Sequence, residues 1–156
     1  MLNRAWIESR IPHKGSMCLL DAVESHTDDE IVCTTLSHRL PGNPLRDDSG
    51  LGIVVGIEYA AQAMAVHGAL RDGGNASSRG GYLVSARDVT WSTQRLDLLE
   101  GPLSVRAQRL SGAASTIMYR FSLHAGADEV LSGRATVVLD AASVDPSKAP
   151  TGTEAS

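Results

Sequence analysis

The stretch from residue 51 to residue 70, LGIVVGIEYAAQAMAVHGAL, constrains the fold of this chain more than any other. Its strongly polar side chains are Glu58, Gln62 and His67, and no charged residues recur along one helical face. A helix that is apolar on all sides is buried, either in a protein core or in a membrane. A membrane span needs about 20 residues with few polar groups, whereas this stretch carries a carboxyl, an amide and an imidazole. The stretch therefore predicts a central core helix.

Glu58 is the residue of this helix whose environment the sequence leaves open. Glu58 and Gln62 are four residues apart, so they share one helical face. A carboxylate is rarely buried without a partner, because its desolvation is costly. In one interpretation Glu58 lies at the margin of the helix and pairs with an arginine or a backbone amide. In the other it is a functional carboxyl in a pocket, where perturbed groups gather. His67 is expected to be structural.

The length and composition are those of one ordinary globular domain. The chain has 156 residues, 42% hydrophobic and 21% charged, which is enough for a sizeable core. The net charge of −4 and the lack of a run of lysines and arginines argue against nucleic-acid binding. The first 15 residues carry scattered charges and no apolar segment, so no signal peptide is expected. Cys18 and Cys33 are then expected to be reduced and buried in a cytoplasmic protein.

Alternating apolar and polar residues predict antiparallel strands on both sides of the helix. Before it, two short apolar runs predict a hairpin, residues 17–23 and 31–36. After it, four segments follow without another helix, residues 82–91, 103–107, 117–123 and 130–139.

One helix with five or six antiparallel strands is an α+β arrangement, in which the sheet wraps the helix. We expect this single domain to occupy residues 1–140. Residues 141–156 contain mainly Ala, Ser, Pro, Thr and Gly without periodicity, and they predict a disordered tail. Asp47, Asp48 or Ser49 is expected to cap the central helix, because all three side chains precede it directly.

Three strings in the first half of the chain resemble one enzyme family. They are IPHKGSMCLLD at residues 11–21, HRLPGNPL at residues 38–45 and GIEYAAQAMA at residues 56–65. Together they resemble the β-hydroxyacyl-(acyl-carrier-protein) dehydratases, and in particular the divergent dehydratase-like proteins of aryl-polyene clusters. The resemblance implies a hot-dog fold, with a long central helix wrapped by an antiparallel sheet.

The resemblance also implies a catalytic pair. In that family a loop histidine and a helix carboxyl meet across a dimer interface, and the motifs carry these roles to His38 and Glu58. The sequence departs from the family pattern, because the loop between the two residues is longer than usual. Ser37 stands where the family has glycine, and Arg39 stands where it has an aromatic residue.

The implied reaction is the elimination of water from a 3-hydroxyacyl thioester. An imidazole with an ordinary pKa of about 6.5 can act as the base, His38, and a carboxyl kept protonated by burial can act as the acid, Glu58. Backbone amides at the helix start, Gly50, Leu51 and Gly52, could bind the thioester oxygen. Gln62 could orient the carboxyl. No cofactor is needed, and the histidines and cysteines lack the spacing of metal ligands.

The implied partners are an acyl carrier protein, which carries the substrate, and a second hot-dog subunit in a homodimer or heterodimer. Two alternatives remain open. A hot-dog thioesterase would use an ionised Glu58 and would not need His38. A non-catalytic subunit would instead complete an active dehydratase, and the longer loop and Arg39 favour this alternative. No nucleic acid and no membrane span are expected.

Overall fold

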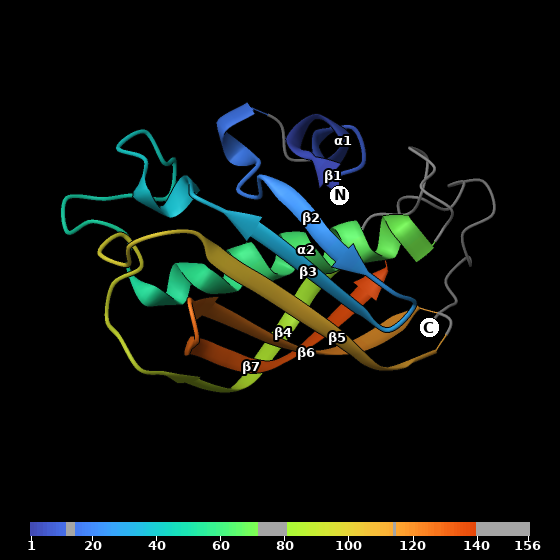
Figure 1. Cartoon of the computed structure of the whole chain (residues 1–156). Helices are drawn as coiled ribbons and strands as arrows, with labels where there is room; N and C mark the ends of the chain where they lie inside the picture. Colours follow the sequence, from blue (N-terminus) through green and yellow to red (C-terminus); the bar gives the residue numbers. More distant parts are fainter. Residues whose placement is uncertain (12–14, 72–80, 114, 140–156) are drawn as a thin grey trace, which may run out of the picture.

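One long helix lies against a curved antiparallel sheet (Figure 1). The computed structural model describes residues 1–11, 15–71, 81–113 and 115–139, so the predicted tail, residues 141–156, lies outside the described residues. The predicted α+β arrangement is confirmed. The sheet has seven strands in the order β1-β2-β3-β5-β6-β7-β4. Their bounds are β1 Leu2–Asn3, β2 Ala22–His26, β3 Glu30–Thr35, β4 Gly81–Trp91, β5 Leu103–Gly112, β6 Thr116–Ala125 and β7 Asp128–Leu139.

The N-terminal part of the sheet differs from the prediction. The two-residue strand β1 pairs with β2, which contributes to a total of seven strands where five or six were expected. The strand predicted at residues 17–23 begins only at Ala22, because residues Gly15–Met17 form a short 3₁₀ helix, η1. The predicted hairpin of β2 and β3 is confirmed, with Val23 opposite Cys33. A five-residue helix, α1 (Arg4–Glu8), follows β1, and the side chain of Asn3 caps it by accepting from the amide of Trp6.

The central helix begins later than the sequence predicts. A 3₁₀ turn, η3 (Ile53–Val55), leads into α2 (Gly56–Arg71). By length and composition Ile53–Arg71 could cross a membrane, but 56% of its most apolar window is buried inside the protein, as expected for a core helix. The predicted cap is wrong, since the Asp47 carboxylate accepts from the amide of Ser49 and no side chain caps η3.

The core lies between α2 and one face of the sheet. Buried side chains alternate along β5 and β6, for example Leu103, Val105 and Ala107 on β5, which explains the period-two pattern of the sequence. At the start of α2 a glycine allows close contact with the sheet. A Cβ atom on Gly56 would lie 2.5 Å from Cδ2 of Leu131. Cys18 and Cys33 are buried free thiols, as predicted.

Candidate active site

His38 lies in a short 3₁₀ helix, η2 (Ser37–Arg39), and its side chain is fully buried. Its Nε2 atom is 3.0 Å from the carbonyl oxygen of Leu99. A carbonyl can only accept a hydrogen bond, so this contact assigns the proton of a neutral ring to Nε2. The Nδ1 atom is also buried and has no hydrogen-bond partner among the described residues. The lone pair of Nδ1 is therefore unpaired within the described structure.

Burial is the main cause that lowers the pKa of His38 below 6.5, and the positive charge of Arg39 lowers it further. The Leu99 carbonyl acts in the opposite direction, because it favours a protonated ring. The net effect keeps the imidazole neutral at neutral pH, which is the form that a general base requires.

A buried polar network fixes η2 against the start of α2. The hydroxyl of Tyr59 is 2.8 Å from Oγ of Ser37, and Asn43 donates to the same hydroxyl at 2.9 Å. Asn43 also donates to the carbonyl oxygen of Ser37 at 3.0 Å. The Ser37 hydroxyl donates to the carbonyl oxygen of Leu19 at 2.7 Å. Ser37, which precedes His38, and Tyr59, which follows Glu58, are thus bonded to each other, although the sequence did not single out Tyr59 or Asn43.

Glu58 does not lie in the apolar pocket that its acid role requires. It is in the first turn of α2 and is exposed, and it forms no hydrogen bond or ion pair with any residue that the structure describes. The charged groups that act on the pKa of His38 are Arg39 and Asp21, so a single chain does not bring Glu58 to the imidazole. Glu58 lies about 100° around the helix axis from the buried Tyr59. The segment before β2 covers Gln62 on the neighbouring turn but does not bond to Glu58.

Gln62 does not orient Glu58, although the two are one turn apart. Its Oε1 accepts from the amide of Leu19 at 2.9 Å, and its Nε2 donates to the carbonyl oxygen of Met17 at 2.8 Å. The amide is buried and fixes the segment between η1 and β2 on the helix. Both ends of the Gln62 amide are thus occupied within the chain, and its predicted substrate-binding role stays a prediction.

The amides predicted to bind the thioester oxygen are mostly occupied as well. The Gly50 amide donates to the carbonyl oxygen of Asp47 at 2.9 Å, and the Leu51 amide donates to Oδ1 of Asp97 at 3.0 Å. Gly52 is exposed and pairs with Arg95 in an isolated bridge. The amides of Gly50 and Leu51 are thus already hydrogen-bonded within the chain. The start of the helix therefore offers fewer free amide donors than its sequence suggested.

Asp97 is the residue that holds this loop, and no motif in the sequence pointed to it. Its carboxylate is almost fully buried and accepts two hydrogen bonds from Arg95, at 3.0 and 2.5 Å. Arg46 lies 3.5 Å from the same carboxylate. The hydrogen bonds from Arg95 are the main cause that holds the pKa of Asp97 well below its usual range. The ionised carboxylate ties residues 46–52 to the segment that carries Leu99.

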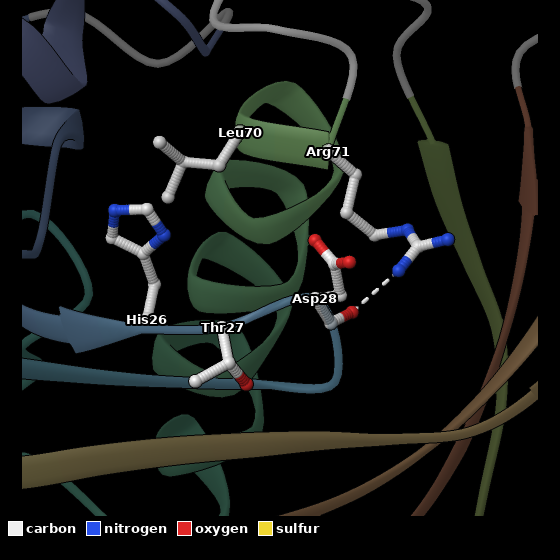
Figure 2. Close-up of a pocket in the computed structure, with 5 residues that line it drawn as sticks. All are labelled: His26, Thr27, Asp28, Leu70 and Arg71. Carbon is white, nitrogen blue, oxygen red and sulfur yellow. Dashed lines mark hydrogen bonds between the residues drawn. The ribbon is translucent and has the colours of Figure 1, made fainter.

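A pocket of about 260 Å³ lies at the opposite end of α2 and does not include His38. Figure 2 shows that it is formed where the turn between β2 and β3 meets the last residues of the helix. Arg71 donates to the carbonyl oxygen of Asp28 there. Near this pocket, on the same helix, His67 is buried between Tyr119 and the carbonyl oxygen of Thr27, which confirms its structural role. The pocket is lined by His26, Thr27, Asp28, Leu70 and Arg71.

No group of three potential metal ligands occurs among the residues that the structure describes.

Solved structures with this architecture define the class of fold. A chain of the dehydratase heterocomplex ApeI:P from Xenorhabdus doucetiae matches with a TM-score of 0.74 at 20% identity, over 86% of this chain and 90% of that chain. Zebra fish thioesterase superfamily member 2 gives 0.61 at 14% identity, over 88% and 95%. A mutant of thioesterase PA1618 from Pseudomonas aeruginosa gives 0.55 at 11% identity, over 76% and 79%. The chain has the hot-dog fold that these dehydratase and thioesterase chains share.

The family follows from the sequence itself. The model of the ApeP-like family, described as ApeP dehydratase, matches residues 5–146. This chain therefore belongs to the ApeP-like dehydratase family. No curated protein matches it at a significant level.

Proposed function

We propose that this chain is a subunit of a dehydratase that removes water from a 3-hydroxyacyl thioester. The observation that carries the proposal is the buried His38 ring, whose Nε2 is fixed by the Leu99 carbonyl while Nδ1 has no partner in the described structure. A neutral imidazole with one ring nitrogen fixed and the other unpaired is suited to take a proton from a carbon next to a thioester. Membership of the ApeP-like dehydratase family supports the same reaction.

The reaction needs a second group in addition to the base. Nδ1 of His38 takes the proton from C2, and the electron pair passes through an enolate-like thioester to break the C3–O bond. A carboxylic acid then donates a proton to the leaving hydroxyl, so that water and a 2,3-unsaturated thioester are formed. Because Glu58 is exposed on its own chain, it acts in a site that a second subunit completes.

The surface supports such a second subunit. β4 is an edge strand that pairs with β7 on one side only, and Val84 and Trp91 on it are exposed. A long edge strand with exposed apolar side chains is a template for pairing with another chain. Around η2 and η3 four further large apolar side chains are exposed, Leu36, Leu40, Val54 and Leu98. A second hot-dog subunit at these surfaces would cover them and desolvate Glu58.

The partner is a related hot-dog protein or a second copy of this chain. The similar ApeI:P structure is a dehydratase heterocomplex, and this favours a heterodimer. The substrate is carried by an acyl carrier protein in the synthesis of a fatty acid or an aryl polyene, as the resemblance implies.

The test is mass spectrometry of 3-hydroxyacyl thioesters incubated with this chain, alone and with a co-expressed hot-dog partner. A loss of one water from the substrate is the expected result. His38→Gln keeps a donor for the Leu99 carbonyl but removes the base, and Glu58→Gln removes the acid. General acid–base groups contribute about 10²–10⁴-fold, so each variant should lose turnover by a factor in that range. The exposed His26 and Glu24 give matched controls, since His26→Gln and Glu24→Gln should retain full activity.

The outcomes separate the alternatives. Release of free acid, with activity retained in His38→Gln and lost in Glu58→Gln, would identify a thioesterase. Full dehydration by a complex that contains both variants would place the active site in the partner. The losses from His38→Gln and Glu58→Gln should not add, because both groups act in one elimination.

A further inference from the structure

Strand pairing brings arginines together in a row on the sheet. Arg134 of β7 lies directly opposite Arg120 of β6 on one side and directly opposite Arg87 of β4 on the other. All three side chains are exposed. Their neighbours Tyr119, Phe121 and Ala135 are buried in the core. Because side chains alternate along a strand, the arginines point away from α2 on the outer face of the sheet. The three strands are neighbours in the sheet (Figure 1).

Among the residues that the structure describes, no ion pair neutralises the row. The side chains of Arg87, Arg120 and Arg134 form no hydrogen bond or salt bridge there, although their backbones pair in the sheet. Like charges directly opposite each other on a sheet are unfavourable for the fold. Next to Arg120 the row continues with the amide of Gln108, and only after it with a carboxylate, Glu30. The fold thus keeps three adjacent positive charges that no described side chain neutralises.

From this juxtaposition we propose that the arginine row, Arg87, Arg134 and Arg120, is a docking surface for an acidic helix of a partner protein. Adjacent strands are about 4.8 Å apart, so the guanidinium groups repeat at about that distance across the sheet. Carboxylates on one face of an α-helix repeat at about 5–6 Å, because residues four apart lie one turn from each other. A helix that lies across the strands places one carboxylate near each arginine. Arginine also binds carboxylates with two parallel hydrogen bonds.

The surroundings of the row favour an acidic protein over other anions. Ser122 and Ser132 lie on the same face, two residues from Arg120 and Arg134 in their strands. These hydroxyls offer hydrogen bonds, whereas membrane-binding helices combine basic groups with apolar anchors and single-stranded nucleic acids are bound by aromatic stacking. The net charge of −4 repels an acidic partner elsewhere, so the row also sets the orientation of binding.

The test is the binding of a labelled synthetic helix, with glutamates at every fourth position along one face, to the full-length chain by fluorescence anisotropy. The same peptide with glutamines is the reference probe. The glutamate peptide should bind and the glutamine peptide should not, and binding should weaken when ionic strength rises from about 0.01 to 0.15 M, as the Debye length falls from about 30 to 8 Å. Arg134→Gln should raise the Kd about tenfold. Arg46→Gln removes an equal charge from the loop near Asp97 and should leave the Kd unchanged.

Two further results would overturn the proposal. Equal binding of both peptides, or an unchanged Kd in Arg134→Gln, would show that the row does not recognise carboxylates. Binding of anionic lipid vesicles or duplex DNA through Arg134, without binding of the acidic peptide, would assign the surface to another class of partner.

A stability measurement separates docking from a structural role. Because Arg134 lies between two like charges, Arg134→Gln should melt at the same temperature as the wild type or higher. A lower melting temperature in Arg134→Gln would show that the row supports the fold and would overturn the assignment as a docking surface.

Discussion

Removal of the Tyr59 hydroxyl is the sharpest test of how this fold positions His38. The phenol ring is fully buried at the start of α2. Its hydroxyl contacts Oγ of Ser37 at 2.8 Å and Nδ2 of Asn43 at 2.9 Å. Tyr59→Phe keeps the ring and its packing but removes both hydrogen bonds. The perturbation therefore acts only on the network that fixes η2 to the helix.

The expected cost follows from these two contacts. A neutral hydrogen bond contributes about 0.5–1.5 kcal/mol net to stability, so two contribute about 1–3 kcal/mol. Ser37 and Asn43 each keep another partner, the carbonyl oxygens of Leu19 and Ser37 respectively. Neither group is left wholly unsatisfied, so we expect a loss of about 1–2 kcal/mol in the free energy of unfolding. This corresponds to roughly a 5–30-fold change in the folded-to-unfolded ratio.

The effect on activity should be larger than the effect on stability. A misplacement of a catalytic group by about 1 Å can cost on the order of 10²-fold in rate. We therefore expect Tyr59→Phe to lower the turnover of the assembled dehydratase by about tenfold or more. Urea unfolding gives the stability, and the mass-spectrometric assay of water loss gives the turnover.

Tyr119→Phe is the matched control. It removes a second buried tyrosine hydroxyl, which lies 2.7 Å from Nδ1 of His67. It should cost about 1 kcal/mol of stability and leave turnover unchanged. Wild-type stability and turnover in Tyr59→Phe would refute the reasoning, because the hydroxyl would then not hold η2. Equal losses of turnover in both variants would show a general effect of destabilisation.

Three further predictions concern the helix, the pH dependence of stability and the edge strand. In α2, Gly56→Ala should lower the free energy of unfolding by up to about 2 kcal/mol, because its Cβ would lie 2.5 Å from a leucine of β7 and overpacking outweighs helix propensity. Gly68→Ala meets open space and should raise it by about 0.5–1 kcal/mol, measured by urea unfolding. Burial lowers the pKa of both His38 and His67. The unfolded chain, with imidazole pKa values of about 6.5, then takes up these protons first, so stability should be complete above about pH 6.5 and decrease as the pH falls below it. Urea unfolding between about pH 5 and 8 measures this slope, and a stability that is constant or rises on acidification would contradict the assignment of both rings as buried and neutral. Val84→Lys, on the free edge of β4, should prevent pairing with a second subunit in light scattering, whereas an unaffected complex would show that this edge is not the interface.

The sequence predicted the elements that depend on local pattern. An apolar stretch at residues 51–70 can only be buried, and alternating residues from β5 to β7 can only be half-buried strands, so the α+β arrangement followed from periodicity. The sequence strings around His38 and Glu58 also indicated the dehydratase family to which the chain belongs. Local signals were weaker at the ends of elements, where tertiary contacts decide. The helix begins at Gly56 and not at residue 51 as predicted. The side chain of Gln62 binds the backbone of Met17 and Leu19, and this segment is not part of the strand predicted there.

The candidate site depended on contacts that sequence spacing cannot express. Glu58 and Gln62 share a helical face in the sequence, but Gln62 is covered by the segment before β2 while Glu58 is exposed. The free Nδ1 of His38 depends on the carbonyl oxygen of Leu99, which is 61 residues away. Such pairings are set by which loops the packed core brings together, and no local rule encodes them.

Composition alone does not reveal the positive charge on the outer face of the sheet. The sequence determines a net charge of −4 and has no run of basic residues, because Arg87, Arg120 and Arg134 are far apart along the chain. Only the antiparallel register of β4, β7 and β6 places them directly opposite each other. Side-chain patterns decide which face of each strand meets water, whereas long-range hydrogen bonding between strands decides which exposed residues become neighbours.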